Sequence, residues 1–422
     1  MWTGPAARNW LQERQIHRRQ HMDYAFSEKV STLKPSAIRE LFKLMVGKGA
    51  VVSLSGGNPS KDSFPVKEIQ EVSARILKDD WIGALQYSVS EGYTPLRDLM
   101  RGYVKEHFGV GTEDDDIVIT SGAQQANDMV AKIFCNEGDV VLLDSISFIG
   151  SISAFKANNL RPVGVDSDDK GMDPVKLEEA ILANPKAKLI YLIPNFHNPT
   201  GFTMPYERRK EIYEVAKKYK IMILEDNPYG QLRFGGEDVP SIKTLDTEGI
   251  VCYSGSFSKV VAPGLRVGYL VANKEIIFRA TLLHQFTDVH PASLPQMIVY
   301  EFFKNYDTDA HIKDVQKLYG DKARFMCEQL REKLPKEVTF IEPQGGMFVW
   351  ITDSTGKIDI GEYVQRLINE YKVAVVSGDV FMSEGGLSHS VRLNFTVPSV
   401  EQIEVGVAAV ADLFKKMYAE ME

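Results

Sequence analysis

The chain has 422 residues, of which 44% are hydrophobic and 25% are charged, and this composition is typical of an ordinary soluble globular protein. Its 49 lysines and arginines against 57 aspartates and glutamates give a formal net charge of −8, whereas a protein that binds a phosphate backbone needs an excess of positive charge. No run of about 18 apolar residues occurs, which argues against a membrane-spanning helix. We therefore expect neither a nucleic acid nor a membrane as a partner.

The cysteines indicate the cellular compartment. Cys135, Cys252 and Cys327 are odd in number and have no metal-ligand spacing. We predict a cytoplasmic protein without a disulfide framework and without a bound metal.

Residues 1–21 differ from the rest of the chain. They hold four arginines against the single acid Glu13, and they contain no apolar segment of the kind found in secretory signals. We predict a disordered basic extension over 1–21, with the folded part beginning at Met22. An upstream mis-start and a transit peptide are the alternatives.

From Met22 on, short apolar runs alternate with helical patterns. The runs that are typical of strands are 116–120, 139–144, 189–194, 221–225, 250–254 and 266–271. Unbroken runs of this kind indicate strands that are buried on both faces of a mostly parallel sheet. Helical stretches lie between them, such as 205–219, which has acidic residues early and lysines late.

The alternation weakens after about residue 290. A charged amphipathic stretch over 310–334 is followed by strand-like runs at 338–341, 347–351, 373–376 and 391–395, and by a final helix from Val400. We predict an α/β protein with two domains. The large domain, 53–304, has a mostly parallel sheet sandwiched by helices, and a smaller α+β domain is built from both chain ends, 22–52 and 305–422.

One lysine stands out. Lys259 ends the motif Ser254-Gly-Ser-Phe-Ser-Lys259, directly after a buried strand, and Arg266 follows. A partly buried amine beside cations has a lowered pKa and becomes a nucleophile suited to Schiff-base chemistry. Ser256, Ser258 and Arg266 together suit a phosphate group. The alternative is a serine-rich helix cap beside a chance lysine.

Three further motifs follow predicted strands. Asp226, in Asp226-Asn-Pro-Tyr229, ends a strand, where open α/β sheets place ligands, and its carboxylate can pair with a protonated ring nitrogen. The alternative for Asp226 is a structural cap or turn. Asn198-Pro-Thr-Gly201 has the preferences of a turn. Thr120-Ser-Gly-Ala-Gln-Gln125 opens a helix whose backbone N–H groups form an anion site.

In this order, these motifs resemble those of the fold-type I pyridoxal-phosphate-dependent aminotransferases of class I/II. The resemblance is closest to the group that includes the 2-aminoadipate, kynurenine and aromatic aminotransferases, and it covers 24–422. Further matching blocks are Ser53-Leu-Ser-Gly-Gly-Asn-Pro59, Gly92-Tyr-Thr-Pro-Leu-Arg97, Gly345-Gly-Met-Phe-Val-Trp350 and Val391-Arg-Leu-Asn-Phe395.

The resemblance implies roles for individual residues around pyridoxal 5′-phosphate. The implied catalytic residues are Lys259 as Schiff base and proton shuttle, Asp226 as partner of the pyridine nitrogen, and Tyr229, which with Asn198 contacts the phenolic oxygen. The implied phosphate ligands are the backbone at Ala123 and Gln124 together with Ser256, Ser258 and Arg266. The implied substrate contacts are Arg392, which clamps the α-carboxylate, and also Gly57 and Asn198.

The resemblance also implies a homodimer with shared active sites, because Tyr87 would reach the phosphate of the neighbouring subunit. Arg39, on a movable segment, would meet a side-chain carboxylate. A surface charge is the alternative for Arg392, packing for Tyr87, and a solvated helix charge for Arg39. The sequence departs from the family pattern at Phe148, where a tyrosine usually stacks on the cofactor, so substrate preference transfers less well than the chemistry.

The predicted function is transfer of an amino group from an aromatic, 2-aminoadipate or aliphatic amino acid to a 2-oxo acid such as 2-oxoglutarate. The main alternative is a β-lyase on the same fold, because the cofactor supports both reactions. A third hypothesis is a regulator fused to a DNA-binding module, but such a module needs about 60–70 further residues.

Overall fold

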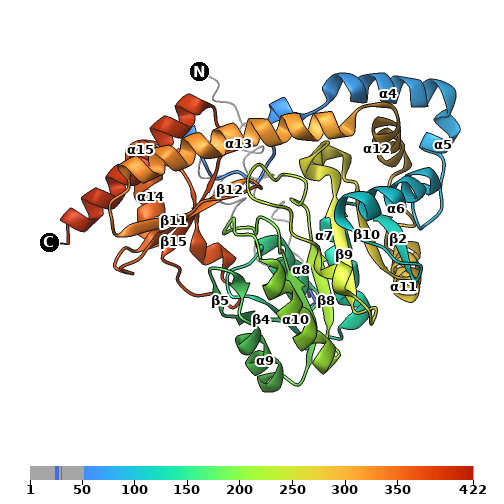
Figure 1. Cartoon of the computed structure of the whole chain (residues 1–422), viewed down its shortest axis with the longest axis horizontal. Coiled ribbons are helices and arrows are strands. Elements are labelled where there is room, and N and C mark those ends of the chain that lie inside the picture. Colours follow the sequence, from blue (N-terminus) through green and yellow to red (C-terminus); the bar gives the residue numbers. More distant parts are fainter. Residues whose placement is uncertain (1–23, 28–29, 31–51, 422) are drawn as a thin grey trace, which may run out of the picture. The chain divides into compact units, whose positions relative to one another are not determined.

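The computed structural model describes residues 24–27, 30 and 52–421. The chain divides into two compact units, Met1–Lys34 and Pro35–Glu422. In the first unit, the rings of Tyr24 and Phe26 lie 6.0 Å apart. All helices and strands labelled in Figure 1 belong to the second unit.

A seven-stranded sheet forms the centre of the second unit, with the strand order β2-β10-β9-β8-β7-β3-β4. The five strands from β9 to β4 pair in parallel, whereas β10 runs antiparallel to β2 and β9. The strands are β2 (Asp115–Thr120), β3 (Val140–Asp144), β4 (Arg161–Val165), β7 (Ala187–Leu192), β8 (Met222–Asp226), β9 (Val251–Ser256) and β10 (Gly268–Asn273). The predicted mostly parallel sheet is confirmed.

The sequence prediction missed β4. Its sequence, Arg-Pro-Val-Gly-Val, contains a proline and a glycine, which are rare inside strands. β4 lies at the edge of the sheet, where a missing N–H group costs no ladder hydrogen bond.

Successive residues of the central strands are buried in different cores. In β3, Val141 and Leu143 pack into one hydrophobic cluster, and Val140 and Leu142 pack into a second one. The first cluster includes residues of α7, α8 and α11, and the second includes residues of α9 and α10. Because side chains alternate between the two faces of a strand, helices cover the sheet on both faces.

Twelve α-helices lie within the described residues. Their bounds are α4 (Val66–Asp79), α5 (Trp81–Leu85), α6 (Thr94–Phe108), α7 (Ala123–Phe134), α8 (Ile149–Ala157), α9 (Pro174–Ala183), α10 (Tyr206–Tyr219), α11 (Lys274–Thr287), α12 (Ser293–Asn305), α13 (Thr308–Lys333), α14 (Ile360–Tyr371) and α15 (Val400–Ala419). The predicted helix at 205–219 forms with Pro205 as its N-cap, and it ends at Lys220 in a left-handed conformation. Across the described segments, no helix combines the length and the hydrophobicity that crossing a bilayer requires.

A smaller antiparallel sheet has the order β11-β12-β15-β14, with strands β11 (Val338–Ile341), β12 (Phe348–Asp353), β15 (Ser390–Asn394) and β14 (Val376–Ser377). In Figure 1 it lies beside α13, α14 and α15. Two short pairs complete the strands, β1 (Val52–Ser53) with β13 (Val373–Ala374), and β5 (Ser167–Asp168) with β6 (Gly171–Met172).

The single strand predicted at 373–376 was wrong. The segment divides into β13, which pairs with β1, and β14, which pairs with β15. All four residues are buried, and a buried apolar run looks the same in the sequence whichever strand it pairs with. The domain boundaries at 52/53 and 304/305 stay a prediction.

The parallel strands bring the sequence motifs to one edge of the sheet. Asp226 is the last residue of β8 and pairs in register with Ser254 of β9. Lys259 follows the end of β9 by three residues, and Asn198 follows the end of β7 by six. The carboxyl ends of neighbouring parallel strands therefore place these three side chains in one region.

Candidate active site

Lys259 ends the short 3₁₀ helix η3 (Phe257–Lys259), which directly follows β9. Its Nζ donates a hydrogen bond of 3.0 Å to the carbonyl oxygen of Gly57. Burial lowers the pKa of Lys259 to about 8, and the positive charges of Arg392 and Arg266 act in the same direction. An added Cβ at Gly57 would meet no atom within 4 Å, so open space lies beside the amine's partner. Lys259 therefore has the environment of a nucleophilic amine.

Asp226 is 2% exposed, and all of its hydrogen-bond donors within the described part of the chain are neutral groups. Asn127 Nδ2 and Tyr191 Oη lie 2.7 and 2.8 Å from its Oδ2, and Ser254 Oγ lies 3.2 Å from its Oδ1. Burial raises the pKa of Asp226, and the three donors oppose that rise. No cation among the described residues forms an ion pair with it, so this buried carboxylate suits a cationic ligand group.

Arg392, on β15, is buried between two aromatic rings, with its guanidinium carbon 4.2 Å from the centre of Phe348 and 4.9 Å from that of Phe381. Nη1 donates to Asn198 Oδ1 at 2.9 Å, and Nη2 donates to the Ser55 carbonyl at 3.0 Å. Nε is buried and has no hydrogen-bond partner among the described residues. Burial lowers the pKa of Arg392 to about 10. A guanidinium held in this way has a donor available for an anion.

Asn198 connects Arg392 to Tyr229. Besides accepting from Arg392, Asn198 donates from Nδ2 to Tyr229 Oη at 3.2 Å. Burial raises the pKa of Tyr229 to about 12. The turn that carries Asn198 is held by His197, whose Nδ1 lies 2.8 Å from Thr200 Oγ1. His197 is fully buried, and burial lowers its pKa to about 3, so its ring is neutral at physiological pH.

A cradle for an anion forms around the start of α7. Arg266 donates from Nη2 to the Ser121 carbonyl at 2.7 Å and from Nη1 to Ser258 Oγ at 3.3 Å, and Ser256 Oγ donates to Ser258 Oγ at 3.0 Å. Gly122 has a φ of +79°, and a Cβ there would lie 2.3 Å from Arg266 Nη2. No described side chain caps the N-terminus of α7, which leaves its first N–H groups for an anion.

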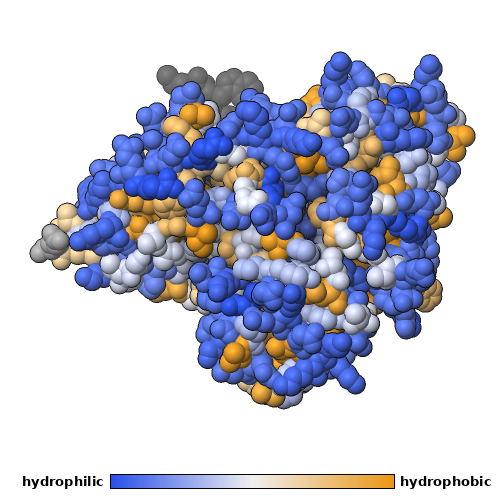
Figure 2. All heavy atoms as spheres, viewed as in Figure 1, coloured by the Kyte–Doolittle hydropathy of each residue, from blue (hydrophilic) through white to orange (hydrophobic). Residues whose placement is uncertain are grey.

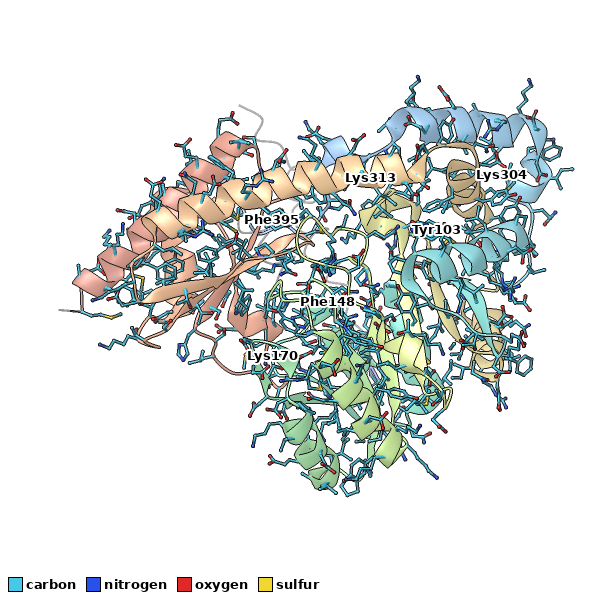
Figure 3. The ribbon with its side chains drawn as sticks, in the orientation of Figure 1. Tyr103, Phe148, Lys170, Lys304, Lys313 and Phe395 are labelled. Carbon is cyan, nitrogen blue, oxygen red and sulfur yellow. The ribbon has the colours of Figure 1, made fainter. Side chains whose placement is uncertain are left out.

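Ala123 and Gln124 form the first turn of α7. Gln124 Nε2 donates to the Gly150 carbonyl at 3.0 Å, which connects α7 to the start of α8. Phe148 is the N-cap residue of α8 and packs against the main core; Figure 3 labels it between the two sheets in that view. A Cβ at Gly150 would clash with both the Phe148 ring and Gln124 Oε1, so these three residues lie close together.

Among the described residues, the contacts of Tyr87 do not join it to this network. Tyr87 is 80% exposed, and its ring packs edge-on against His290 at 5.9 Å. Arg39 lies outside the residues that the structure describes.

The residues that support the predicted ones were not predicted from the sequence. Asn127, Tyr191 and Ser254 contact Asp226, and Ser55 and Phe381 contact Arg392. Ser254 lay in a quoted motif but had no assigned role. Tyr191 lay in a run assigned to a buried strand, and nothing in that run distinguishes a packing tyrosine from one that donates to a carboxylate.

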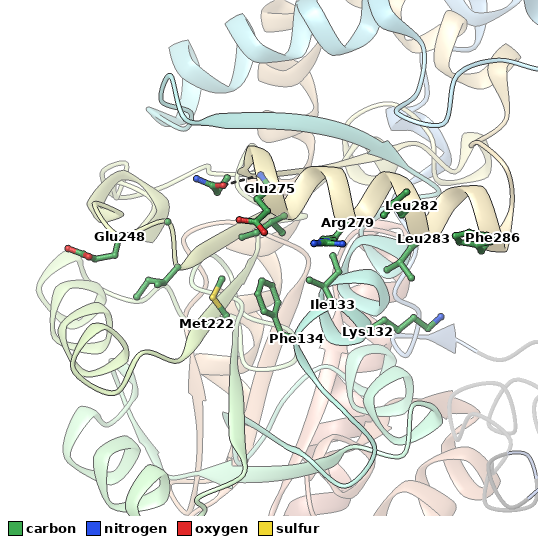
Figure 4. Close-up of a pocket in the computed structure, with 14 residues that line it drawn as sticks. Lys132, Ile133, Phe134, Met222, Glu248, Glu275, Arg279, Leu282, Leu283 and Phe286 are labelled. Carbon is green, nitrogen blue, oxygen red and sulfur yellow. Dashed lines mark hydrogen bonds between the residues drawn. The ribbon is translucent and has the colours of Figure 1, made fainter.

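A large surface pocket, of about 870 Å³, lies elsewhere (Figure 4). Its lining includes Met222, Ile250, Asn273 and Phe286, and none of the predicted site residues. Met222 begins β8 whereas Asp226 ends it, so this pocket lies at the opposite edge of the sheet from the motifs. Among the residues that the structure describes, no group of three or more His, Cys, Asp and Glu side chains could hold a metal ion.

Comparison with known proteins shows the family. The family model "Aminotransferase class I and II" matches residues 49–410. The chain is 37% identical over 401 residues to aromatic-amino-acid aminotransferase 1 of Thermococcus litoralis, covering 94% of this chain and 95% of the relative. It is similar to the crystal structure of the kynurenine aminotransferase of Pyrococcus horikoshii in complex with PMP, with a TM-score of 0.89, 34% identity, and coverage of 93% and 97%. It is also similar to the α-aminoadipate aminotransferase of Thermus thermophilus, complexed with N-(5′-phosphopyridoxyl)-L-leucine, with a TM-score of 0.84, 36% identity, and coverage of 94% and 98%.

The residues present fit pyridoxal 5′-phosphate. The cradle at Gly122 and Arg266 suits its phosphate, the buried Asp226 lacks the cation that a protonated ring nitrogen supplies, and Lys259 is an amine with a lowered pKa. The donor and acceptor set therefore agrees with the comparisons. This chain belongs to the class I and II aminotransferase family, and it is a pyridoxal-phosphate-dependent aminotransferase.

Proposed function

We propose that this aminotransferase takes its amino group from aromatic, 2-aminoadipate or long aliphatic amino acids and passes it to 2-oxoglutarate. The observation that carries the proposal is the pair of arginines near Lys259, Arg266 in the cradle at α7 and Arg392 between two phenylalanines. One cation serves the cofactor's phosphate and the other serves a carboxylate of the substrate. The names of the relatives support the choice of substrates.

The proposal assigns a role to each residue around the bound cofactor. Bound pyridoxal 5′-phosphate supplies the electron sink for the negative charge that develops at the substrate α-carbon. Lys259 forms the covalent link to the cofactor and, once displaced, moves the α-proton, for which an amine with a pKa near 8 is well suited. Asp226 holds the ring nitrogen in its protonated form, and Asn198 and Tyr229 donate to the phenolic oxygen. Ala123, Gln124, Ser256 and Ser258 hold the phosphate with Arg266.

The substrate side of the proposal rests on Arg392, Gly57 and Phe148. The free Nε of Arg392 and the open space beside Gly57 suit an α-carboxylate. Phe148 supplies a ring that stacks on the cofactor and apolar surface for a hydrophobic substrate. We assign Arg39 to recognition of a side-chain carboxylate, as the sequence predicts.

We further propose a homodimer in which Tyr87 reaches the phosphate site of the partner subunit. Tyr87 belongs to a group of exposed hydrophobic side chains that bracket its own contact with His290: Trp81, Ile82, Leu85, Val89 and Val289. A group of large exposed apolar side chains close together is typical of a protein–protein interface. On the face that Figure 2 shows, hydrophilic residues predominate and hydrophobic ones form small separate groups.

A cytoplasmic location completes the proposal. Its support is that Cys135, Cys252 and Cys327 are all free thiols. Free, scattered cysteines are typical of proteins in reducing compartments.

The test of the proposed function is a half-reaction screen. The purified holoenzyme is mixed with each of the twenty amino acids, 2-aminoadipate and kynurenine, and the cofactor absorbance is recorded before and after adding 2-oxoglutarate. We expect the band to shift with aromatic, 2-aminoadipate and long aliphatic donors and to return with the 2-oxo acid. A band that shifts but does not return, with pyruvate or ammonia released, would contradict amino transfer and indicate a lyase.

A further inference from the structure

Asp226 is part of a closed ring of hydrogen bonds with three neutral side chains. Asn127 Nδ2 donates to Asp226 Oδ2 at 2.7 Å and to Ser151 Oγ at 3.2 Å. Ser151 Oγ donates to Tyr191 Oη at 2.9 Å, and Tyr191 Oη donates to Asp226 Oδ2 at 2.8 Å. The four residues are all buried, and they come from α7, α8, β7 and β8.

The chemistry of the groups gives this ring a direction. An amide nitrogen can only donate, so Asn127 uses both its hydrogens on Ser151 and Asp226. The Ser151 hydroxyl accepts from Asn127 and is free to donate to Tyr191, whose own hydrogen then points at Asp226. Burial, and then the charge of Asp226, raise the pKa of Tyr191 far above its usual value, so the phenol keeps that hydrogen. The donors therefore form two routes that both end at the Asp226 carboxylate: Asn127 donates to it directly, and Asn127, Ser151 and Tyr191 form a chain in which each donates to the next and Tyr191 donates to Asp226.

The opposite orientation of the Asn127 amide would require a different charge on Asp226. With the Asn127 amide turned over, its oxygen would lie against the Asp226 carboxylate, which is favourable only when Asp226 carries a proton. Asp226 would then be a neutral acid. The direction of the ring and the charge of Asp226 are thus coupled.

We infer that Asn127, Ser151 and Tyr191 are positioning residues that hold the Asp226 carboxylate ionised and in one orientation, ready to pair with the protonated ring nitrogen of the cofactor. This rests on the proposed role of Asp226. Ser254 is the third donor to the Asp226 carboxylate; it donates to the other oxygen, Oδ1, and lies outside the ring. The other titratable group whose charge interacts with Asp226 is Tyr229.

The ring should determine the pH below which the protein loses affinity for the cofactor. As the pH falls through the pKa of Asp226, the carboxylate gains a proton and loses its attraction for a ring N–H⁺ group. Removal of a donor raises that pKa further, so a variant should lose affinity for the cofactor at a higher pH than the wild type does. One hydrogen bond to a charged group changes the acid dissociation constant of that group about tenfold, which corresponds to a shift of about one pH unit.

The test compares full-length apoproteins that are titrated with pyridoxal 5′-phosphate, followed by absorbance, across the acid range. We plot cofactor affinity against pH. For Tyr191→Phe we expect the fall in affinity on the acid side to occur about one pH unit higher than in the wild type. Ser151→Ala should move it in the same direction by less, because Ser151 does not contact Asp226. In the holoenzymes, kcat should fall while the KM for the amino donor stays near that of the wild type.

Tyr363→Phe is the matched control. Tyr363 is as buried as Tyr191, but its hydroxyl donates to the Val410 carbonyl at 2.7 Å, away from Asp226. We expect this variant to lower the melting temperature of the apoprotein without moving the fall in affinity on the acid side. A shift in Tyr363→Phe equal to that in Tyr191→Phe would overturn the inference, because it would show a general effect of a lost buried hydroxyl.

A fourth variant, Asp226→Ala, separates this inference from the proposed function. If Asp226→Ala weakens binding while Tyr191→Phe and Ser151→Ala both match the wild type, the ring inference is overturned and the role of Asp226 stands. If Asp226→Ala itself leaves both the affinity and the absorbance spectrum unchanged, the proposed role of Asp226 is wrong, and the inference fails with it.

Discussion

Two lysines of this chain illustrate two different uses of a buried charge. Lys243, in the 3₁₀ helix η2 (Ile242–Leu245), is 4% exposed, and its Nζ lies 2.8 Å from both Asp115 Oδ1 and Asp246 Oδ2. Burial alone would lower the pKa of Lys243, yet the two carboxylates raise it. The Nζ of Lys259 donates a hydrogen bond to a carbonyl oxygen and forms no ion pair with any described residue, and burial with two nearby arginines lowers its pKa to about 8.

The difference shows which charges the chain neutralises itself. The Lys243 cluster is complete, and such a cluster needs no ligand. Around Lys259, the buried Asp226 and Arg392 form no ion pair within the described residues and are held by neutral groups. In the proposed function, the cofactor supplies the opposite charge for Asp226 and the substrate supplies that for Arg392. This contrast marks the active site more clearly than the size of a pocket does.

The largest expected effect is the loss of Lys259. Lys259→Ala should lower turnover by about three orders of magnitude or more, because the covalent link and the proton shuttle are lost together, while cofactor still binds through its phosphate and ring. Steady-state kinetics and a cofactor titration measure both quantities. The free energy of unfolding of the apoprotein should not fall.

Lys243→Ala should have the opposite effect, a loss of stability without a loss of turnover. It leaves two buried carboxylates facing each other without a cation, so it should lower the free energy of unfolding by about 3–5 kcal/mol, as read from urea denaturation. The molecules that remain folded should keep their turnover. If Lys243→Ala abolishes activity in a fully folded protein, the distinction between the two lysines does not hold.

The next effect compares Asp226 with Asn198. Asp226→Ala should cost far more activity than Asn198→Ala. In the proposed function the aspartate keeps the ring nitrogen protonated, and without that charge the developing negative charge has no sink. Loss of the asparagine removes hydrogen bonds worth about 1–2 kcal/mol. The ratio of kcat/KM values measures the difference, and equal losses would show that this division of roles is wrong.

The sequence predicted the part of the site that is local in the chain. Asp226 and Lys259 each come at or just after a buried strand, and the common edge of parallel strands explains why they meet. Asn127 and Tyr191 were not found, because their contacts with Asp226 join elements that are far apart in the sequence. The segment 373–376 was misassigned for a related reason, since its pairing partners are set by tertiary structure. Packing between distant elements leaves no periodic signal in one sequence.

The proposed sharing of active sites between two subunits predicts a smaller but distinctive effect. Mixing a Lys259→Ala subunit with an impaired Tyr87→Ala subunit should recover about one quarter of the wild-type activity, because half of the dimers are mixed and each contains one complete site. Activity assays after subunit exchange test this. A fully active monomer in dilute sedimentation runs would contradict the proposed dimer.

The smallest effect concerns Arg39, which lies outside the described residues. Arg39→Ala should raise the KM for dicarboxylic substrates by about tenfold, from the loss of one charge-assisted hydrogen bond. The KM for phenylalanine or leucine should change little. Equal losses for both classes would indicate that Arg39 acts on folding or closure and has no part in recognition.

The most direct test of the central claim is reduction of the holoenzyme with borohydride, followed by peptide mapping. Only a lysine that is covalently linked to the cofactor becomes a stable secondary amine. The contrast between the two buried lysines predicts that the label is found on Lys259 and that Lys243 is unmodified. A label on any lysine other than Lys259, or no label at all, would contradict the account.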